Sequence, residues 1–124
     1  MAVKKILIVE DQALVRMYLC SCVEKSKECE VAGTLTRADA ALQRCGEGHI
    51  DLILMDIKMP NLDGLEATKI IRELSATVPI IAQSAFAYEQ DRKAAEEAGC
   101  NDFIAKPIAD DKLKAMIHKW LLPS

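Results

Sequence analysis

Short runs rich in apolar residues recur along the chain, bounded by charged, polar or turn-forming residues. Apolar runs of this length are typical of strands that are buried on both faces, as in a parallel sheet. The sequence therefore predicts five strands, at residues 5–9, 31–35, 52–55, 79–84 and 102–105.

The longer stretches between these runs carry the signals of helices. Thr36 followed by Asp39 resembles a capping box and predicts the start of the second helix. Gly99 is placed to end the fourth helix as a C-cap. The last stretch carries an amphipathic stripe at i, i+3, i+4, i+7 and i+8, formed by Leu113, Met116, Ile117, Trp120 and Leu121. Besides the second helix, the sequence predicts a first helix at residues 12–26, a third at 63–74, a fourth at 87–98 and a fifth at 109–121.

Five strands that alternate with five helices predict an α/β fold, a doubly wound five-stranded parallel sheet. The chain has 124 residues and contains no linker, repeat or low-complexity tract, so we expect a single domain over residues 1–124. In such sheets, ligands bind beyond the carboxyl ends of the strands, near the topological switch point. Functional side chains are therefore expected where strands end.

Charged and hydroxyl side chains stand at four of the five predicted strand ends. Glu10 and Asp11 follow the first strand, Asp56 follows the third, Ser84 closes the fourth and Lys106 follows the fifth. Each residue alone has an ordinary explanation as a helix cap, a strand end or a solvated loop residue. Their joint occurrence favours one site at a shared edge of the sheet.

Three carboxylates at this edge predict a metal site. Two carboxylates about 4 Å apart repel each other by on the order of 4 kcal/mol at an effective dielectric constant near 20. A hard divalent cation removes this repulsion, and Mg²⁺ prefers oxygen ligands. Glu10, Asp11 and Asp56 are the expected ligands, with a backbone carbonyl just after Asp56 as a further one. No His or Cys cluster favours zinc.

A carboxylate beside Mg²⁺ can also act as a nucleophile toward phosphorus and form an acyl phosphate. Asp56 is the best candidate because the apolar strand "LILM" ends directly before it. Lys106 offers a compact cation for the phosphoryl group, and Ser84 offers a hydroxyl donor.

Composition narrows the remaining function classes. The formal net charge is -3 with both signs interspersed, so no basic patch indicates nucleic-acid binding. No apolar run is long enough for a membrane span or a secretory signal, and we expect a cytoplasmic domain. The five cysteines show no paired metal spacing and are expected to be reduced thiols.

Four segments, "ILIVED", "DLILMDIKMPNLDGLEATKIIRE", "PIIAQSAFA" and "AGCNDFIAKPI", resemble the receiver domain of two-component response regulators. The resemblance covers essentially the whole chain and implies a flavodoxin-like strand order, 2-1-3-4-5. It implies that Asp56 is the phosphoacceptor and that Glu10 and Asp11 hold Mg²⁺, with Mn²⁺ as an expected substitute. The backbone carbonyl of Lys58 is the implied further ligand.

The resemblance also assigns the residues that respond to phosphorylation. It implies that Ser84 and Lys106 bind the phosphoryl group, that Phe103 is the switch aromatic and that Pro107 follows a cis peptide bond. Two positions depart from the common pattern. Glu10 stands where Asp is commonest, and Phe103 replaces the frequent Tyr, so the strength of the switch is less defined.

The implied partners are a histidine kinase or a histidine phosphotransfer domain, together with an output partner that the sequence does not identify. Such a domain is a signalling phosphoacceptor that catalyses only its own phosphorylation and dephosphorylation. The first helix is apolar on more than one side, which suggests a docking surface. Val15, Pro107 and Ile108 are the expected docking residues.

Three other classes compete with this interpretation. A dehalogenase-like phosphatase requires a second Asp where the chain has Lys58, and a flavodoxin requires a glycine- and hydroxyl-rich phosphate loop where the chain has "EDQALVR". A non-phosphorylated scaffold, or pseudo-receiver, is the main alternative, although every site position is filled.

The sequence fits two protein contexts for such a domain. One is a stand-alone regulator, and the other, slightly favoured, is the receiver of a hybrid sensor kinase.

Overall fold

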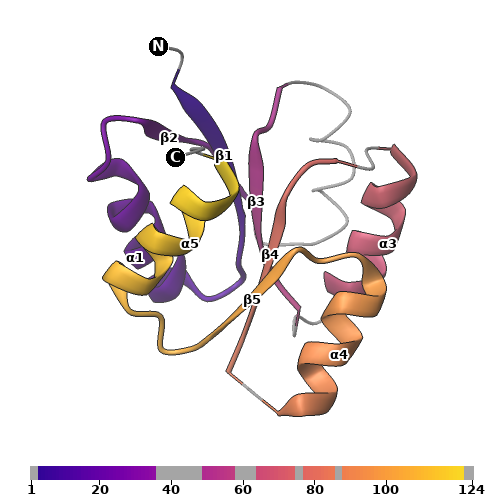
Figure 1. Ribbon diagram of the computed structural model, residues 1–124. Helices are drawn as coiled ribbons and strands as arrows, with labels where there is room; N and C mark the ends of the chain where they lie inside the picture. Colours follow the sequence, from indigo (N-terminus) through magenta and orange to yellow (C-terminus); the bar gives the residue numbers. More distant parts are fainter. Residues whose placement is uncertain (1–2, 36–48, 58–63, 75–76, 86–87, 122–124) are drawn as a thin grey trace.

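Five strands form one sheet in the computed structural model of the chain, which describes residues 3–35, 49–57, 64–74, 77–85 and 88–121. Neighbouring strands all pair in parallel. Their order across the sheet is β2-β1-β3-β4-β5, which confirms the predicted order (Figure 1). The strands are β1 (Lys4–Val9), β2 (Cys29–Leu35), β3 (Leu52–Asp56), β4 (Ile80–Ser84) and β5 (Asp102–Ala105).

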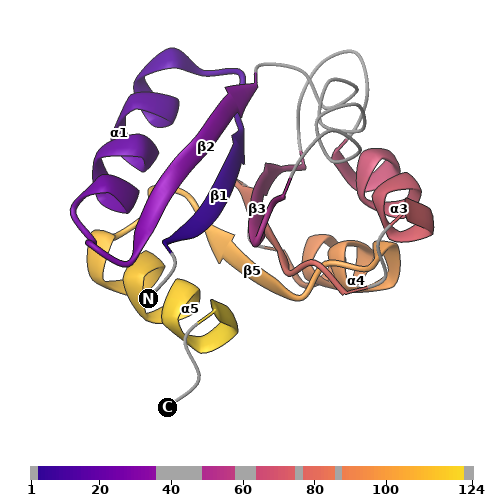
Figure 2. The same cartoon turned by 90° about the horizontal axis from the view of Figure 1, so that it is seen from above.

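Helices cover both faces of this sheet. On one face lie two helices, α1 (Ala13–Glu24) and α5 (Asp110–Leu121), and on the other lie α3 (Gly64–Leu74) and α4 (Glu89–Ala98), as Figure 2 shows. This arrangement explains why the central strands are mostly apolar, since neither face of them meets water.

Strand β1 shows how one strand serves two cores. Its residues Ile6, Leu7, Ile8 and Val9 are all completely buried. Successive side chains of a strand point to opposite faces of the sheet. Ile6 and Ile8 therefore join the core beneath α1 and α5, whereas Leu7 and Val9 join the core beneath α3 and α4.

The strand registers bring the carboxyl ends of the strands together. Asp56 of β3 pairs with Gln83 of β4, and Ser84 of β4 pairs with Ala105 of β5. Pairing continues past the last strand, where the N–H of Lys106 donates to the carbonyl oxygen of Ser84 over 2.8 Å. Side chains at these ends therefore share one edge of the sheet.

Gly64 allows helix α3 to begin directly against the end of β3. A Cβ atom at this position would lie 2.3 Å from the carbonyl oxygen of Asp56 and 2.8 Å from the Cα atom of Ile57. Both neighbours are backbone atoms, which cannot move aside as a side chain can. Glycine is therefore required for this close approach.

The observed bounds differ little from the predicted ones. Strand β2 begins at Cys29, earlier than predicted, because its register with β1 extends back to Lys4. Gly99 has a φ of 111° and ends α4, which confirms the predicted C-cap. The described ranges contain four helices. The predicted second helix lies in residues 36–48, outside the described residues, and stays a prediction.

Among the helices that the structure describes, none combines the length and apolar content needed to cross a membrane.

Candidate functional site

Three carboxylates meet at the carboxyl edge of the sheet, as the strand ends predict. Glu10, Asp11 and Asp56 each offer a carboxylate oxygen, and these oxygens all lie within 4.8 Å of one another. Glu10 and Asp56 are 0% and 2% exposed, whereas Asp11 is half-buried. In the described part of the chain this is the only acidic or thiol cluster with such close spacing.

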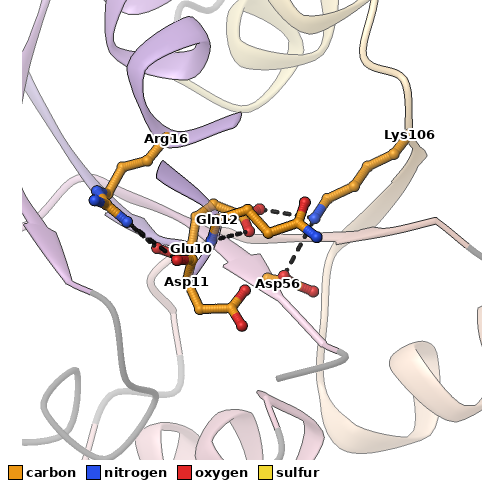
Figure 3. A network of polar contacts seen from close by, with 6 residues as sticks. All are labelled: Glu10, Asp11, Gln12, Arg16, Asp56 and Lys106. Atoms are coloured by element: carbon orange, nitrogen blue, oxygen red, sulfur yellow. Dashed lines mark hydrogen bonds and ion pairs between the residues drawn. The ribbon is translucent and has the colours of Figure 1, made fainter. Parts of the chain in front are cut away.

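The buried carboxylate of Glu10 is held at both oxygens (Figure 3). Its Oε2 atom accepts a hydrogen bond from the backbone N–H of Gln12 over 3.0 Å, and its Oε1 atom lies 2.8 Å from Nζ of Lys106. Burial raises the pKa of Glu10 to about 7, although the contacts with Lys106 and Gln12 act in the opposite direction. The nearby charge of Asp56 makes a smaller contribution to the same rise.

Lys106 connects the two buried carboxylates. Its Nζ atom lies 3.2 Å from Oδ2 of Asp56 as well as 2.8 Å from Glu10, and its side chain is only 13% exposed. Burial alone would lower the pKa of Lys106, but the hydrogen bond to Glu10 and the negative charges of Asp56 and Glu10 raise it above its ordinary value. The side chain is therefore an ammonium ion at neutral pH. The Lys106–Pro107 peptide bond is cis, the isomer that the family resemblance implies.

Ser84 and Phe103 lie on neighbouring strands beside this group. Ser84 is completely buried at the end of β4, and Phe103 of β5 is 8% exposed in the core beneath α4. The guanidinium carbon of Arg92, from α4, lies 4.9 Å from the centre of the Phe103 ring. A cation at this distance attracts the face of the ring. The ring is therefore covered by a charged side chain that the sequence did not single out.

The three predicted docking residues meet at one surface hollow, although Ile108 is only 8% exposed and belongs to the core beneath α1 and α5. Val15, Pro107 and Ile108 line a hollow of about 300 Å³ with Leu14, Tyr18 and Lys106. Leu14 is 81% exposed. Because Lys106 lines the hollow and also contacts Glu10 and Asp56, the hollow adjoins the site. The carbonyl of Lys58, the predicted fourth metal ligand, lies outside the described residues.

Arg16 and Gln12 are neighbours of the site that sequence reasoning missed. Nη1 of Arg16 lies 3.0 Å from the carbonyl oxygen of Glu10 and 3.4 Å from that of Asp11. Helix periodicity places Arg16 on the first turn of α1, but a side chain that bends back onto a preceding turn leaves no mark in the sequence.

The donors present fit a hard divalent cation. Three carboxylates supply oxygen ligands, with neither imidazole nor thiol among them, and this is the ligand set that Mg²⁺ prefers. Lys106 balances one of the three negative charges when all three acids are ionised. A divalent cation would balance the other two.

Comparison with known proteins places the chain in one family. Residues 6–118 match the response regulator receiver domain. The chain is 34% identical over 116 residues to the chemotaxis protein CheY of Thermotoga maritima, an alignment that covers 94% of this chain and 96% of that protein. Two other relatives are much longer. The chain spans 18% of the length of one and 7% of the length of the other.

Solved structures give the same answer. The receiver domain of sensor histidine kinase PA1611 from Pseudomonas aeruginosa PAO1, with a magnesium ion coordinated in its active site cleft, matches with a TM-score of 0.87 and 32% identity, covering 97% of this chain and 98% of that one. A chain in the co-crystal structure of the Saccharomyces cerevisiae histidine phosphotransfer protein Ypd1 and the receiver domain of its response regulator Ssk1 matches with a TM-score of 0.88 and 30% identity, covering 96% of this chain and 89% of that one. The protein therefore belongs to the response regulator receiver domain family of two-component signalling.

Proposed function

We propose that Asp56 accepts a phosphoryl group from a phosphohistidine on a histidine kinase or a histidine phosphotransfer domain. The observation that supports this most directly is the buried Asp56 carboxylate at a strand end, with the Lys106 ammonium 3.2 Å from one oxygen and two further carboxylates close by. A buried nucleophile, a neighbouring cation and a group of metal-binding oxygens are the parts that phosphoryl transfer requires.

Glu10, Asp11 and Asp56 would hold the metal, together with the backbone carbonyl of Lys58. When bound, Mg²⁺ neutralises charge on the oxygens of the transferred phosphoryl group. Mn²⁺, which also binds carboxylate oxygens, is an expected substitute. The full occupation of these positions argues against a non-phosphorylated scaffold.

In the transfer itself, an oxygen of the Asp56 carboxylate attacks phosphorus and forms a P–O bond. The P–N bond of the donor breaks, and its electron pair leaves with the partner's imidazole. Lys106 already lies beside the attacking carboxylate and pairs with the negative oxygens as they arrive. Its buried position makes this attraction stronger than it would be in water.

Phosphorylation then acts on the fold through Ser84 and Phe103. The new acyl phosphate draws the Ser84 hydroxyl toward one of its oxygens, and the loop after β4 moves with it. The Phe103 ring occupies the space that is released. This is a local change of charge that biases an element with two conformations.

The hollow formed by Val15, Pro107 and Ile108 is the proposed docking surface for the phosphohistidine donor. It opens beside Lys106 and has an apolar lining, so an apolar residue on a partner helix fits there. The Ypd1–Ssk1 complex supports this class of partner, because it joins a histidine phosphotransfer protein to a receiver domain.

We further propose that residues 1–124 form a single cytoplasmic receiver with five helices, the second of them within residues 36–48. As a signalling phosphoacceptor, it catalyses only its own phosphorylation and dephosphorylation. The match to the receiver of a sensor histidine kinase supports a role within a hybrid kinase. Neither direct nucleic-acid binding nor membrane insertion forms part of this function.

The experiment that tests the function is intact-mass spectrometry after incubation with acetyl phosphate and Mg²⁺. We expect wild type to gain one phosphoryl group and Asp56→Asn to gain none. Chelating Mg²⁺ should also prevent the gain. If wild type gains no mass either from acetyl phosphate or from phosphorylated histidine phosphotransfer proteins, the chain is a scaffold and the proposal is wrong.

A further inference from the structure

Arg16 reaches back from α1 to the turn that carries two of the three acidic residues. One guanidinium nitrogen, Nη1, lies 3.0 Å from the carbonyl oxygen of Glu10 and 3.4 Å from that of Asp11. The backbone N–H of Arg16 donates to Gln12 over 2.9 Å and so begins the helix. The same residue therefore starts α1 with its backbone and holds the preceding turn with its side chain.

Figure 3 shows Arg16 and Lys106 approaching this turn from opposite sides. Lys106 contacts the carboxylates of Glu10 and Asp56, whereas Arg16 contacts only backbone carbonyls within the group drawn. Arg16 does not touch the atoms that would bind a metal. Any effect of Arg16 on the positions of the metal ligands must pass through the backbone of Glu10 and Asp11.

Asp11 depends on this backbone contact more than Glu10 does. The Glu10 carboxylate is fixed by Gln12 and Lys106. For the Asp11 carboxylate, the structure shows no hydrogen bond or ion pair to any other described residue. The backbone from which it projects therefore limits the positions that the carboxylate can reach, and the Asp11 carbonyl oxygen is one of the two that Arg16 holds.

We propose that Arg16 is a positioning residue for the metal site, which fixes the turn so that the Asp11 and Glu10 carboxylates face Asp56. This inference rests on the proposed Mg²⁺-dependent phosphorylation of Asp56 and adds a residue that acts from behind the ligands. Groups that orient metal ligands affect affinity strongly, and losing one commonly weakens metal binding by about 10- to 100-fold.

The positive charge of Arg16 alone predicts an effect on Mg²⁺ binding opposite to that of positioning. A guanidinium is always positively charged, so by electrostatics alone it repels a nearby divalent cation. If charge were its main influence, removal of Arg16 would tighten Mg²⁺ binding. If positioning is its main influence, removal weakens Mg²⁺ binding. The sign of the change separates the two explanations.

The test is calorimetric titration of Mg²⁺ into wild type, Arg16→Met and a control, Arg72→Met. Arg72 is matched to Arg16 because its Nε also donates to a backbone carbonyl, that of Gly99, over 2.9 Å, but on a segment that carries no site residue. We expect Arg16→Met to raise the Kd for Mg²⁺ by about 10-fold or more. We expect Arg72→Met to leave it within about twofold of wild type, even if both variants unfold at lower temperature.

Phosphorylation by acetyl phosphate supplies the second measurement. Arg16→Met should need more Mg²⁺ for half-maximal rate, yet approach the wild-type rate when Mg²⁺ is saturating. Should Arg16→Met fail to fold, the polar Arg16→Gln, whose side chain is too short to make both contacts, replaces it. An unchanged or tighter Kd in the folded variant overturns the inference. If wild type itself neither binds Mg²⁺ nor accepts phosphate, the proposed function has failed instead.

Discussion

At the scale of single residues, Lys106 holds the acidic group together before any metal or phosphate arrives. Its ammonium lies within 3.2 Å of both buried carboxylates, Glu10 and Asp56. A buried charge without a partner costs several kcal/mol, so the Lys106 ammonium stabilises both carboxylates and is stabilised by them. Strand-end residues predicted this convergence because parallel strands end at one edge. The contact of Arg16 was not predictable, since it depends on how a side chain folds back in space.

Ser84 should separate phosphorylation from the response to it. We expect Ser84→Ala to accept a phosphoryl group at Asp56 but to switch weakly, because the hydroxyl that draws the loop after β4 inward is lost. A hydrogen bond to a charged group contributes about 1.5–3 kcal/mol, which lowers the switching equilibrium constant by about 10-fold or more. Amide chemical shifts around Phe103 in the phosphorylated protein measure this population.

Ser84→Thr is the matched control, since it keeps the hydroxyl, and it should switch as wild type does. If phosphorylated Ser84→Ala shows the same shifts around Phe103 as phosphorylated wild type, Ser84 has no part in the switch.

The lowered pKa of the Asp51 carboxyl makes the stability of the protein depend on pH. Burial alone would raise its pKa, but the backbone N–H of Lys5 and the side chain of His49 lower the pKa below its ordinary value of 3.8. Its contribution to stability is therefore fully present above about pH 4 and is lost as the pH falls through the lowered value. Wild type should be more stable than Asp51→Asn by about 1 kcal/mol at pH 7.

Urea unfolding at a series of pH values between neutral and acidic conditions measures this difference. We expect it to be constant above about pH 4 and to shrink below it. A difference that stays the same down to the lowest pH at which the protein folds would show that ionised Asp51 has no special role.

At the scale of elements, the site depends on where helices begin and strands end. Helix α3 begins at Gly64 against the end of β3, and α1 begins just after Asp11. The apolar runs predicted the strands well because burial on both faces leaves a clear pattern. The start of β2 was predicted less well, since Cys29 and Glu30 lie at its less apolar beginning and pair through the backbone.

Gly64→Ala should destabilise the protein although alanine is the better helix former. Helix propensity favours alanine over glycine by about 1 kcal/mol. The new Cβ atom, however, would lie 2.3 Å from the Asp56 carbonyl oxygen, so α3 has to move. Such overpacking costs about 1–3 kcal/mol, and we expect a lower free energy of unfolding in urea and slower phosphorylation of Asp56.

Lys69→Ala, on the exposed side of the same helix, is the control and should change stability by less than about 0.5 kcal/mol. A Gly64→Ala variant as stable as wild type, or more stable, would mean that α3 adapts easily and that its start does not fix the end of β3.

At the scale of the whole molecule, the sheet brings parts of the chain that are far apart in sequence to one edge and leaves the face beside it open to partners. The apolar surface of α1 and the segment after β5 meet in the hollow lined by Val15, Pro107 and Ile108. The strand order came from the family resemblance, because periodicity alone gives strands but not their neighbours. The sequence alone suggested this surface only as a surplus of apolar residues on α1.

The Val15→Asp substitution should therefore weaken docking of the phosphohistidine donor and leave the phosphorylation chemistry at Asp56 intact. A carboxylate in the apolar hollow loses its hydration when a partner helix docks, which costs about 1–3 kcal/mol or more. We expect transfer from a phosphorylated histidine phosphotransfer protein to slow by about 10-fold or more, as 1.4 kcal/mol corresponds to a factor of ten. Labelling by acetyl phosphate, which needs no docking, should stay at the wild-type rate.

Ser21→Asp places the same charge on an exposed position of the same helix, outside the hollow, and controls for a general effect of charge on α1. It should receive phosphate from the protein donor at the wild-type rate. Equal slowing of both variants would indicate long-range repulsion rather than docking. Equal rates for Val15→Asp and wild type would place the donor on another surface, and Lys106 would then have to be reached from a direction other than the hollow beside it.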